Sequence, residues 1–322
     1  MYLRLTAALL ALAAGAAGVV VSVLLLRSVP GPAGGTAGAD APAASPAEAP
    51  AVPGGRIATP SDPGFPSPPP GALVLAREAG RDALALAVAD GFVRVSVLGP
   101  AGDGVRGLEV SLQFGRGYLQ PTDSCGAGCY QLETQGLPDS PVTVRLGGDA
   151  YRFELPSLPA PDGGALVARA EETWNGLKTL VWHERLASSP TNVLHTVYRA
   201  VAPDGLEYTT AGGSAAVIIG GERWDSSAPG APWHRSEQDP PVRQPQPFWA
   251  RAEDVHVLGG GRVGGRSVAR VSFFDPSTPA WFEASIDPES GRTLTLDMTA
   301  AGHFMHHVYG PFDAPFRLAP PT

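Results

Sequence analysis

Hydrophobic and polar residues alternate along most of the chain between residues 71 and 155. The apolar positions are Phe92, Val93, Val95 and Val97 in one segment and Leu108, Val110, Leu112 and Phe114 in the next. The sequence Gly-Pro-Ala-Gly-Asp-Gly at residues 99 to 104 separates the two segments as a turn. A period of two is typical of strands with one buried face. Several such segments in a row predict a small antiparallel β-sandwich, which we call the first module.

The period changes to helical spacing between residues 165 and 181. Apolar side chains recur there at Leu166, Val167, Ala170, Trp174, Leu177 and Leu180, which predicts one amphipathic helix. Alternating segments then return, separated by hairpin turns such as Ala-Pro-Asp-Gly at 202 to 205 and Asp-Pro-Glu-Ser-Gly at 287 to 291. The segment PFWARAEDVHVLG at 247 to 259 is interpreted as a second, shorter helix.

The order of elements in residues 165 to 322, which we call the second module, resembles the LolA-like lipoprotein-carrier fold. That fold includes the LppX and LprG type lipid carriers and the sensor RseB. The resemblance extends to the strings A-E-E-T-W-N-G-L-K-T-L, V-I-I-G-G-E-R-W, S-F-F-D-P-S-T-P-A-W-F, I-D-P-E-S-G-R-T-L and M-T-A-A-G-H-F-M-H-H. It implies a curved antiparallel half-barrel with covering helices, whose apolar cavity takes a lipid or an acyl chain.

Large apolar side chains on the alternating segments of the second module are the candidate ligand contacts. They are Trp182, Tyr198, Tyr208, Ile218, Phe273, Phe282 and Met298. A curved sheet with one helix cannot fill its concave face as a sandwich does, so these side chains would line either a cavity or a core. The sequence leaves both alternatives open, because it does not measure an unfilled volume.

The first module resembles the immunoglobulin-like domain of actinobacterial CopD-type copper-resistance membrane proteins. The resemblance rests on V-R-V-S-V-L-G-P-A-G-D-G-V-R-G-L-E-V and on C-G-A-G-C-Y. It implies an immunoglobulin-like β-sandwich at 71 to 155. Cys125 and Cys129, the two cysteines of the chain, are interpreted as a short disulfide, with a thiolate metal site as the alternative.

The N-terminal 27 residues have the pattern of a transmembrane signal anchor. Leu5 to Leu26 is an uncharged apolar run that is long enough to cross a hydrocarbon core of ~30 Å. A cleaved signal peptide is the alternative, but its apolar run is usually shorter. Residues 28 to 70 contain mostly Pro, Ala, Gly and Ser and are expected to form a disordered tether. The chain is therefore predicted to be a single-pass protein of the bacterial cell membrane with its bulk outside the cytoplasm.

His303, Met305 and His307 alternate in the string H-F-M-H-H, so a strand would place them on one face. Imidazole and thioether groups are ligands that copper accepts, which makes these three residues a candidate metal site. The alternative is that Met305 packs in the core and the histidines lie near the end of the sheet. No other cofactor is expected.

Composition and motifs narrow the classes of function. The net charge of −8, without a basic block, argues against a nucleic-acid partner. The sequence contains no G-x-S-x-G or H-E-x-x-H motif, and we expect no enzyme. The leading hypothesis is a membrane-anchored binding protein for a lipid or a lipoprotein acyl chain. A copper-handling accessory protein and a stress sensor resembling RseB, with another membrane protein as its partner, are the other two hypotheses.

Overall fold

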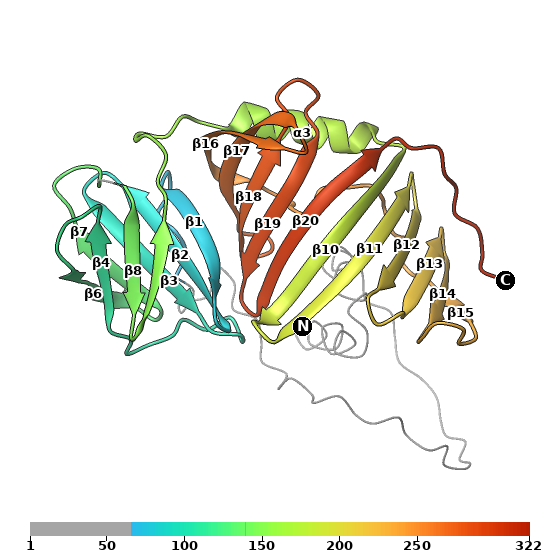
Figure 1. Ribbon diagram of the computed structural model, residues 1–322, viewed down its shortest axis with the longest axis horizontal. Coiled ribbons are helices and arrows are strands. Elements are labelled where there is room, and N and C mark those ends of the chain that lie inside the picture. Colours follow the sequence, from blue (N-terminus) through green and yellow to red (C-terminus); the bar gives the residue numbers. More distant parts are fainter. Residues whose placement is uncertain (1–65, 139) are drawn as a thin grey trace, which may run out of the picture.

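The computed structural model describes residues 66 to 138 and 140 to 322, which are mainly β structure (Figure 1). The predicted anchor and most of the predicted tether lie outside the described residues. Within the described part of the chain, no helix is long and apolar enough to cross a membrane. Pro66 is buried, and its carbonyl accepts a hydrogen bond of 3.0 Å from the Ser96 hydroxyl. Residues 66 to 70, placed in the tether by the sequence analysis, therefore pack on the first module.

The first module consists of two antiparallel sheets that enclose one core. The five-stranded sheet has the order β1-β2-β3-β7-β6, and the four-stranded sheet has the order β5-β4-β8-β9. The strands are β1 (Leu73–Ala79), β2 (Asp82–Ala89), β3 (Phe92–Leu98), β4 (Val110–Phe114), β5 (Gln120–Pro121), β6 (Asp123–Gly126), β7 (Cys129–Glu133), β8 (Val142–Leu146) and β9 (Asp149–Phe153). This arrangement is the antiparallel sandwich that the alternating pattern predicts.

Strand β2 shows how the sequence buries both faces of the five-stranded sheet. Its large residues Leu84, Leu86 and Val88 point into the core of the sandwich. The alternate positions hold alanines, and these pack in a separate cluster with aromatic side chains of the second module. Because side chains alternate across a strand, a repeat of Leu and Ala gives one face that fills a core and one smooth face that accepts a neighbouring sheet.

The second module consists of one helix and one eleven-stranded antiparallel sheet, with the order β15-β14-β13-β12-β11-β10-β20-β19-β18-β17-β16. The elements are α3 (Gly164–Gly176), β10 (Thr179–Ser189), β11 (Asn192–Val201), β12 (Gly205–Thr210), β13 (Ala215–Ile219), β14 (Glu222–Ser226), β15 (His234–Glu237), β16 (Glu253–Val263), β17 (Arg266–Asp275), β18 (Ala280–Ile286), β19 (Thr293–Ala300) and β20 (His303–Phe312). The last strand, β20, pairs with the first, β10, and so joins the two hairpin meanders into one sheet.

The predicted amphipathic helix is present as α3 but is shorter than expected, and the second predicted helix was wrong. The helix expected over 165 to 181 ends at Gly176, where Leu177 takes an extended conformation, and Leu180 already belongs to β10. The second helix expected at 247 to 259 is absent from the described residues. Its second half forms the start of β16, where Val255 and Val257 have the branched side chains that strands favour. In place of a few helices, the described part of the chain contains the one α-helix α3.

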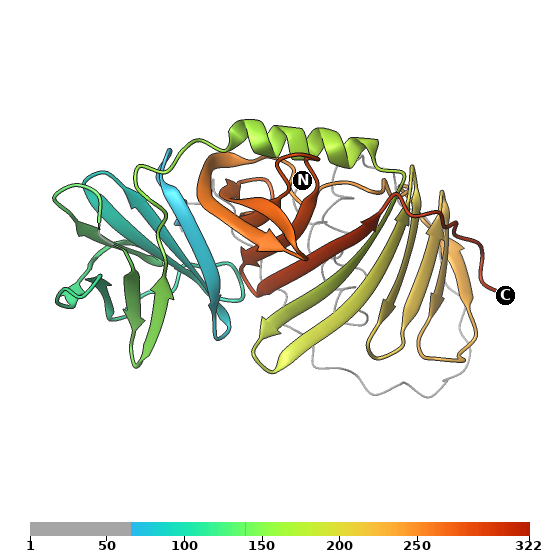
Figure 2. The ribbon, with the colours of Figure 1, turned by 45° about the horizontal axis from the view of Figure 1, so that its top comes forward.

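The eleven-stranded sheet is strongly curved, and α3 lies along its concave side (Figure 2). Apolar side chains from α3 and from strands on both sides of the β10–β20 pair form one cluster on this side. The convex side carries the first module, whose β1 contacts β16, β17, β18 and β19. Ala72 and Val74 of the first module share a buried cluster there with Trp281 and Phe304.

Candidate functional site

The concave face of the second module brings together the side chains that the sequence analysis selected as ligand contacts. Six of them are buried in one apolar cluster with α3, and Met298 packs against that cluster. The six are Trp182, Tyr198, Tyr208, Ile218, Phe273 and Phe282. They come from β10, β11, β12, β13, β17 and β18, so the candidate surface extends across most of the sheet.

Aromatic rings organise this face in two groups. The rings of Trp182 and Tyr198 are stacked with centroids 4.6 Å apart, because β10 and β11 pair these two residues directly. Phe273 and Phe282 form a second stacked pair with centroids 5.1 Å apart, on β17 and β18. Paired aromatic rings add to the stability of a sheet beyond their buried area.

The face is covered by two different kinds of element. Helix α3 has 13 residues and is ~20 Å long, whereas eleven strands span ~48 Å across a sheet. A segment without helix or strand, residues 238 to 252, which we call the cover segment, supplies the further covering side chains Val242, Phe248 and Trp249. The helix alone is too short to cover the face, so the irregular segment completes the enclosure.

The cover segment is held by side-chain packing and by single hydrogen bonds instead of by strand pairing. The indole N–H of Trp249 donates a hydrogen bond of 2.7 Å to Glu171 of α3, and its ring meets Phe273 edge-on at 5.3 Å. The ring of Phe248 lies 6.0 Å from that of Trp182 and 4.4 Å from that of His307. A segment without strand or helix hydrogen bonds is expected to open at lower free energy than paired strands.

A buried polar network lies in the middle of this apolar face. Nε2 of His307 lies 2.8 Å from Oε2 of Glu184, and Nδ1 of His307 lies 2.8 Å from the Tyr309 hydroxyl. The Tyr198 hydroxyl donates a hydrogen bond of 3.1 Å to the other carboxylate oxygen of Glu184. The side chains of Glu184 and His307 are both fully buried. Four residues from β10, β11 and β20 thus satisfy one another's polar groups.

The protonation states in the network follow from burial. Burial lowers the pKa of His307, although its hydrogen bond with Glu184 acts in the opposite direction. Burial also raises the pKa of Tyr198 and Tyr309 well above the usual value, with Glu184 adding to both shifts. A neutral His307 then donates its Nε2–H to Glu184 and accepts a hydrogen bond from Tyr309 at Nδ1. The network therefore places the side chains of Glu184 and His307 within an apolar cluster, where their hydrogen bonds replace contact with solvent.

The three candidate metal ligands lie on the concave face, as their alternation on β20 predicts. Both ring nitrogens of His307 already have protein partners, and Met305 belongs to the apolar cluster. Burial lowers the pKa of His303, whose Nδ1 lies 3.4 Å from the Ala301 carbonyl. Within the described residues, no group of three or more His, Cys, Asp or Glu side chains is arranged to hold a metal ion. A disulfide joins Cys125 to Cys129 in the first module, so their sulfurs are not free as thiolates.

Glu184 and the cover segment were not among the candidate site residues predicted from the sequence. Glu184 occupies an inward position of β10, between Trp182 and Leu186. Its position could have been noticed in the sequence, because an acidic residue at an inward position of a strand is rarely buried unless it has a partner. The cover segment carried no periodic signal, and its aromatic residues were assigned to the second helix that is not present.

No protein-family model and no curated protein sequence matches this chain. Solved structures similar to it include LprF from Mycobacterium bovis, with 8% identity over 50% of this chain and 99% of that one, at a TM-score of 0.38. A LolA superfamily protein from Nitrosomonas europaea has 10% identity over 50% of this chain and 96% of that one, at a TM-score of 0.25. A DUF1329 family protein from Desulfovibrio piger has 8% identity over 49% of this chain and 93% of that one, at a TM-score of 0.26. These similarities concern the course of the backbone, and no site residue is transferred from them.

Proposed function

We propose that this chain is a membrane-anchored, extracytoplasmic binding protein without catalytic activity. Its second module binds a hydrophobic ligand, a lipid or the acyl chain of a lipoprotein, on the concave face of the curved sheet. The first module acts as a spacer or docking module between the anchor and the carrier. The proposal rests on one observation, which is that an apolar face made by many strands is completed by an irregular cover segment.

The energetics of such a site are favourable. An acyl chain gains about 0.8 kcal/mol for each methylene that it buries, so ten methylenes gain about 8 kcal/mol. Displacing one partly buried aromatic side chain of the cover segment, such as Phe248, costs about 2 kcal/mol. A ligand of this length that displaces Phe248 alone therefore gains more than the displacement costs.

The geometry does not favour the copper hypothesis. A metal ion at His307 would have to displace either Glu184 or Tyr309, and both lie at hydrogen-bonding distance. The disulfide between Cys125 and Cys129 also removes the thiolates that would complete a Cu(I) site.

Quenching of tryptophan fluorescence by brominated fatty acids tests the proposal. Bromine quenches tryptophan on contact, and Trp182 lies on the concave face whereas Trp281 lies on the convex face. With the full-length chain, we expect saturable quenching that decreases in Trp182→Phe and is unchanged in Trp281→Phe. Equal loss of quenching in both variants would mean that the acyl chain does not bind at the concave face.

A further inference from the structure

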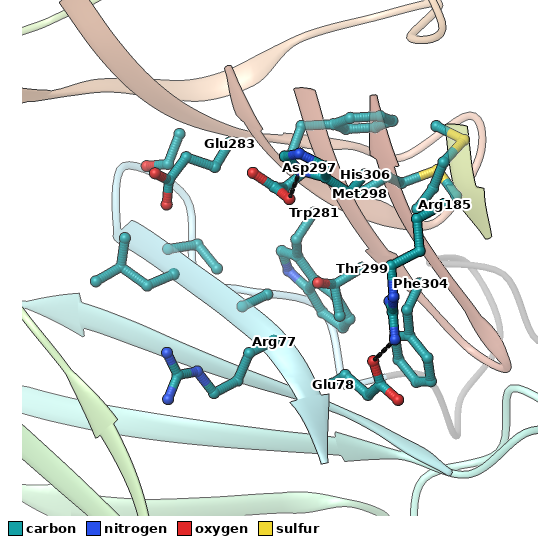
Figure 3. A pocket seen from close by; sticks show the side chains of 16 residues that line it. Arg77, Glu78, Arg185, Trp281, Glu283, Asp297, Met298, Thr299, Phe304 and His306 are labelled. Carbon is teal, nitrogen blue, oxygen red and sulfur yellow. Dashed lines mark hydrogen bonds and ion pairs between the residues drawn. The ribbon is translucent and has the colours of Figure 1, made fainter. Parts of the chain in front are cut away.

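The pocket between β1 and the convex face of the second module has no free carboxylate to offer a ligand. Each of the three carboxylates that line it has a partner, and Figure 3 shows two of these pairs. The pairs are Glu78 with Arg185, Asp297 with His306, and Glu283 with Arg270. One edge of the same sheet is different, because it combines unpaired backbone groups with arginines that have no ion pair.

Strand β16 forms this edge of the eleven-stranded sheet (Figure 1). The chain itself covers the first half of the edge, just before α3 begins. The carbonyl of Val255 accepts a hydrogen bond of 3.0 Å from the N–H of Gly163. The N–H of Val257 donates one of 2.8 Å to the carbonyl of Pro161, and the bridge between the two segments is antiparallel. The edge of β16 therefore accepts an antiparallel strand.

The turn that joins β16 to β17 sets the direction of the backbone groups in the second half of the edge. Gly264 and Gly265 have φ values of +55° and +82°, as a two-residue hairpin turn requires. The residues on either side of the turn, Val263 and Arg266, pair with each other. A turn of this kind is closed by a hydrogen-bonded pair, and hydrogen-bonded and non-hydrogen-bonded pairs then alternate along an antiparallel ladder.

Four backbone groups of β16 consequently point toward the free edge. They are the N–H and C=O groups of Gly260 and Arg262, which occupy the non-hydrogen-bonded positions opposite β17. The bulge between Val257 and Gly259 adds one residue, so the outward direction passes from Val257 to Gly260. In the part of the chain that the structure describes, no backbone group outside β17 bonds to residues 259 to 263.

Glycine leaves this part of the edge open to an approaching strand. Gly259 and Gly260 are both exposed. A Cβ atom at Gly259 would meet nothing within 4 Å, and one at Gly260 would meet only the Val268 carbonyl oxygen, at 3.8 Å. Edge strands are commonly protected by charged side chains or proline, and two neighbouring glycines provide no such obstruction. The side chains of an added strand therefore have room beside them.

The hairpin that carries the edge is basic. Residues 255 to 274 contain three arginines and no Asp or Glu. Arg270 is in an ion pair, whereas Arg262 and Arg266 have no carboxylate oxygen within 4.0 Å among the described residues. Arg262 donates one hydrogen bond of 2.6 Å to a carbonyl of its own turn. Asp287 interacts with Arg266 at longer range, while its oxygens accept hydrogen bonds within the turn that follows β18.

We propose that the free edge of β16 binds an extended, acidic peptide segment of another protein, which adds to the sheet as an antiparallel strand. The backbone of the segment bonds to the outward groups of Gly260 and Arg262. Its carboxylates pair with the guanidinium groups of Arg262 and Arg266. A second copy of this chain is the poorer occupant, because pairing β16 with itself would bring two basic hairpins together.

Fluorescence anisotropy with the full-length chain tests the proposal. The probe is a fluorescein-labelled peptide that alternates valine and glutamate, and the comparison peptide alternates valine and lysine. We expect saturable binding of the glutamate peptide, weaker at high salt, and no binding of the lysine peptide. Arg262→Gln and Arg266→Gln should each weaken the binding by up to about fivefold. Arg116→Gln, which removes an exposed arginine of the first module, should leave the affinity unchanged.

Two further changes separate strand addition from simple attraction between charges. Gly260→Pro removes an outward N–H and obstructs the edge, but it keeps every charge and the hydrogen bonds between β16 and β17. We expect it to weaken binding about tenfold or more, with the midpoint of thermal unfolding little changed. N-methylation of the amides of the probe peptide should weaken binding similarly, and it leaves the protein unaltered.

Three results would overturn the proposal. They are the absence of saturable binding, equal binding of the lysine peptide, and unchanged affinity for the N-methylated peptide. Light scattering adds a fourth, because a dimer of the chain that Gly260→Pro dissociates would assign the edge to a second copy.

Discussion

Glu184 and His307 form a fully buried pair in the middle of an apolar face, with Oε2 and Nε2 2.8 Å apart. The two residues are 123 positions apart in sequence, and they meet because β20 returns to pair with β10. The pair therefore joins the first and the last strand of the second module at the centre of the candidate site.

Glu184→Ala should strongly destabilise the second module. The variant leaves the buried Nε2–H of His307 and the hydroxyl group of Tyr198 without their acceptor, and each such group costs about 1 to 3 kcal/mol. Urea unfolding followed by tryptophan fluorescence measures the change. Glu154→Ala is the matched control, because its ion pair with Arg152 is exposed and contributes less than about 1 kcal/mol. Similar losses in the two variants would show that the buried interactions of Glu184 contribute no more to the free energy of unfolding than an exposed ion pair does.

Acidification should destabilise the second module through His307. Burial lowers the pKa of His307 below its usual value of 6.5, which the unfolded chain retains. Between the lowered pKa in the folded chain and 6.5, the unfolded chain binds more protons than the folded chain does. The free energy of unfolding therefore falls as the pH decreases from about 7 to about 5. The lowered pKa of His303 adds to the fall, whereas His306 has the opposite effect, because its hydrogen bond with Asp297 raises its pKa.

Two variants test the sign of each contribution. The fall in stability between the two pH values should be smaller in His307→Gln than in the unmodified chain. It should be larger in His306→Gln, which loses a group that stabilises the folded state at low pH. Urea unfolding at each pH gives the three slopes, and identical slopes would contradict the assigned shifts.

Gly291→Ala should loosen the contact between α3 and the hairpin that joins β18 to β19. Gly291 has a φ of +71°, and a Cβ atom there would lie 2.4 Å from the Thr173 hydroxyl of α3. We expect a loss of more than about 1 to 3 kcal/mol, the usual cost of the backbone strain alone. Gly264→Ala is the control, since its φ is +55° and nothing lies within 4 Å of the added Cβ atom. A loss no larger than that of the control would show that α3 adjusts freely.

Amide hydrogen exchange should distinguish the cover segment from the sheet. Residues 238 to 252 have few backbone hydrogen bonds, among them Gln244 N–H to the Pro203 carbonyl and Ala250 N–H to Asp275. These amides should exchange faster than those of β10 and β20, and a bound acyl chain should change their rates more than those of β16. Uniform exchange across the second module would exclude an opening cover.

The sequence was most informative where burial alternates with a period of two. The apolar positions from Phe92 to Val97 and from Val110 to Phe114 predict strands β3 and β4 correctly. Leu177 and Leu180 were assigned to a helix but belong to extended backbone. Both side chains are nevertheless buried in the apolar cluster with α3, as their spacing predicts. Local spacing therefore predicted the buried face of the chain even where it gave the wrong element.

Pairing between distant strands was not predictable in the same way. The contact of Glu184 with His307 depends on the register of β20 against β10, and nothing local to either residue specifies that register. The segment from 247 to 259 was misassigned because a short apolar run fits a helix and a strand equally well. Residues 253 to 259 form part of β16 because they pair with β17.

The proposed function requires an acyl chain to occupy the concave face of the second module. Photo-crosslinking of the full-length chain with a diazirine-labelled fatty acid, followed by peptide mapping, locates the bound chain. We expect adducts on inward positions such as Tyr208, Ile218 and Met298, with competition by unlabelled fatty acid. Adducts confined to the convex face, or labelling that unlabelled fatty acid does not reduce, would contradict it.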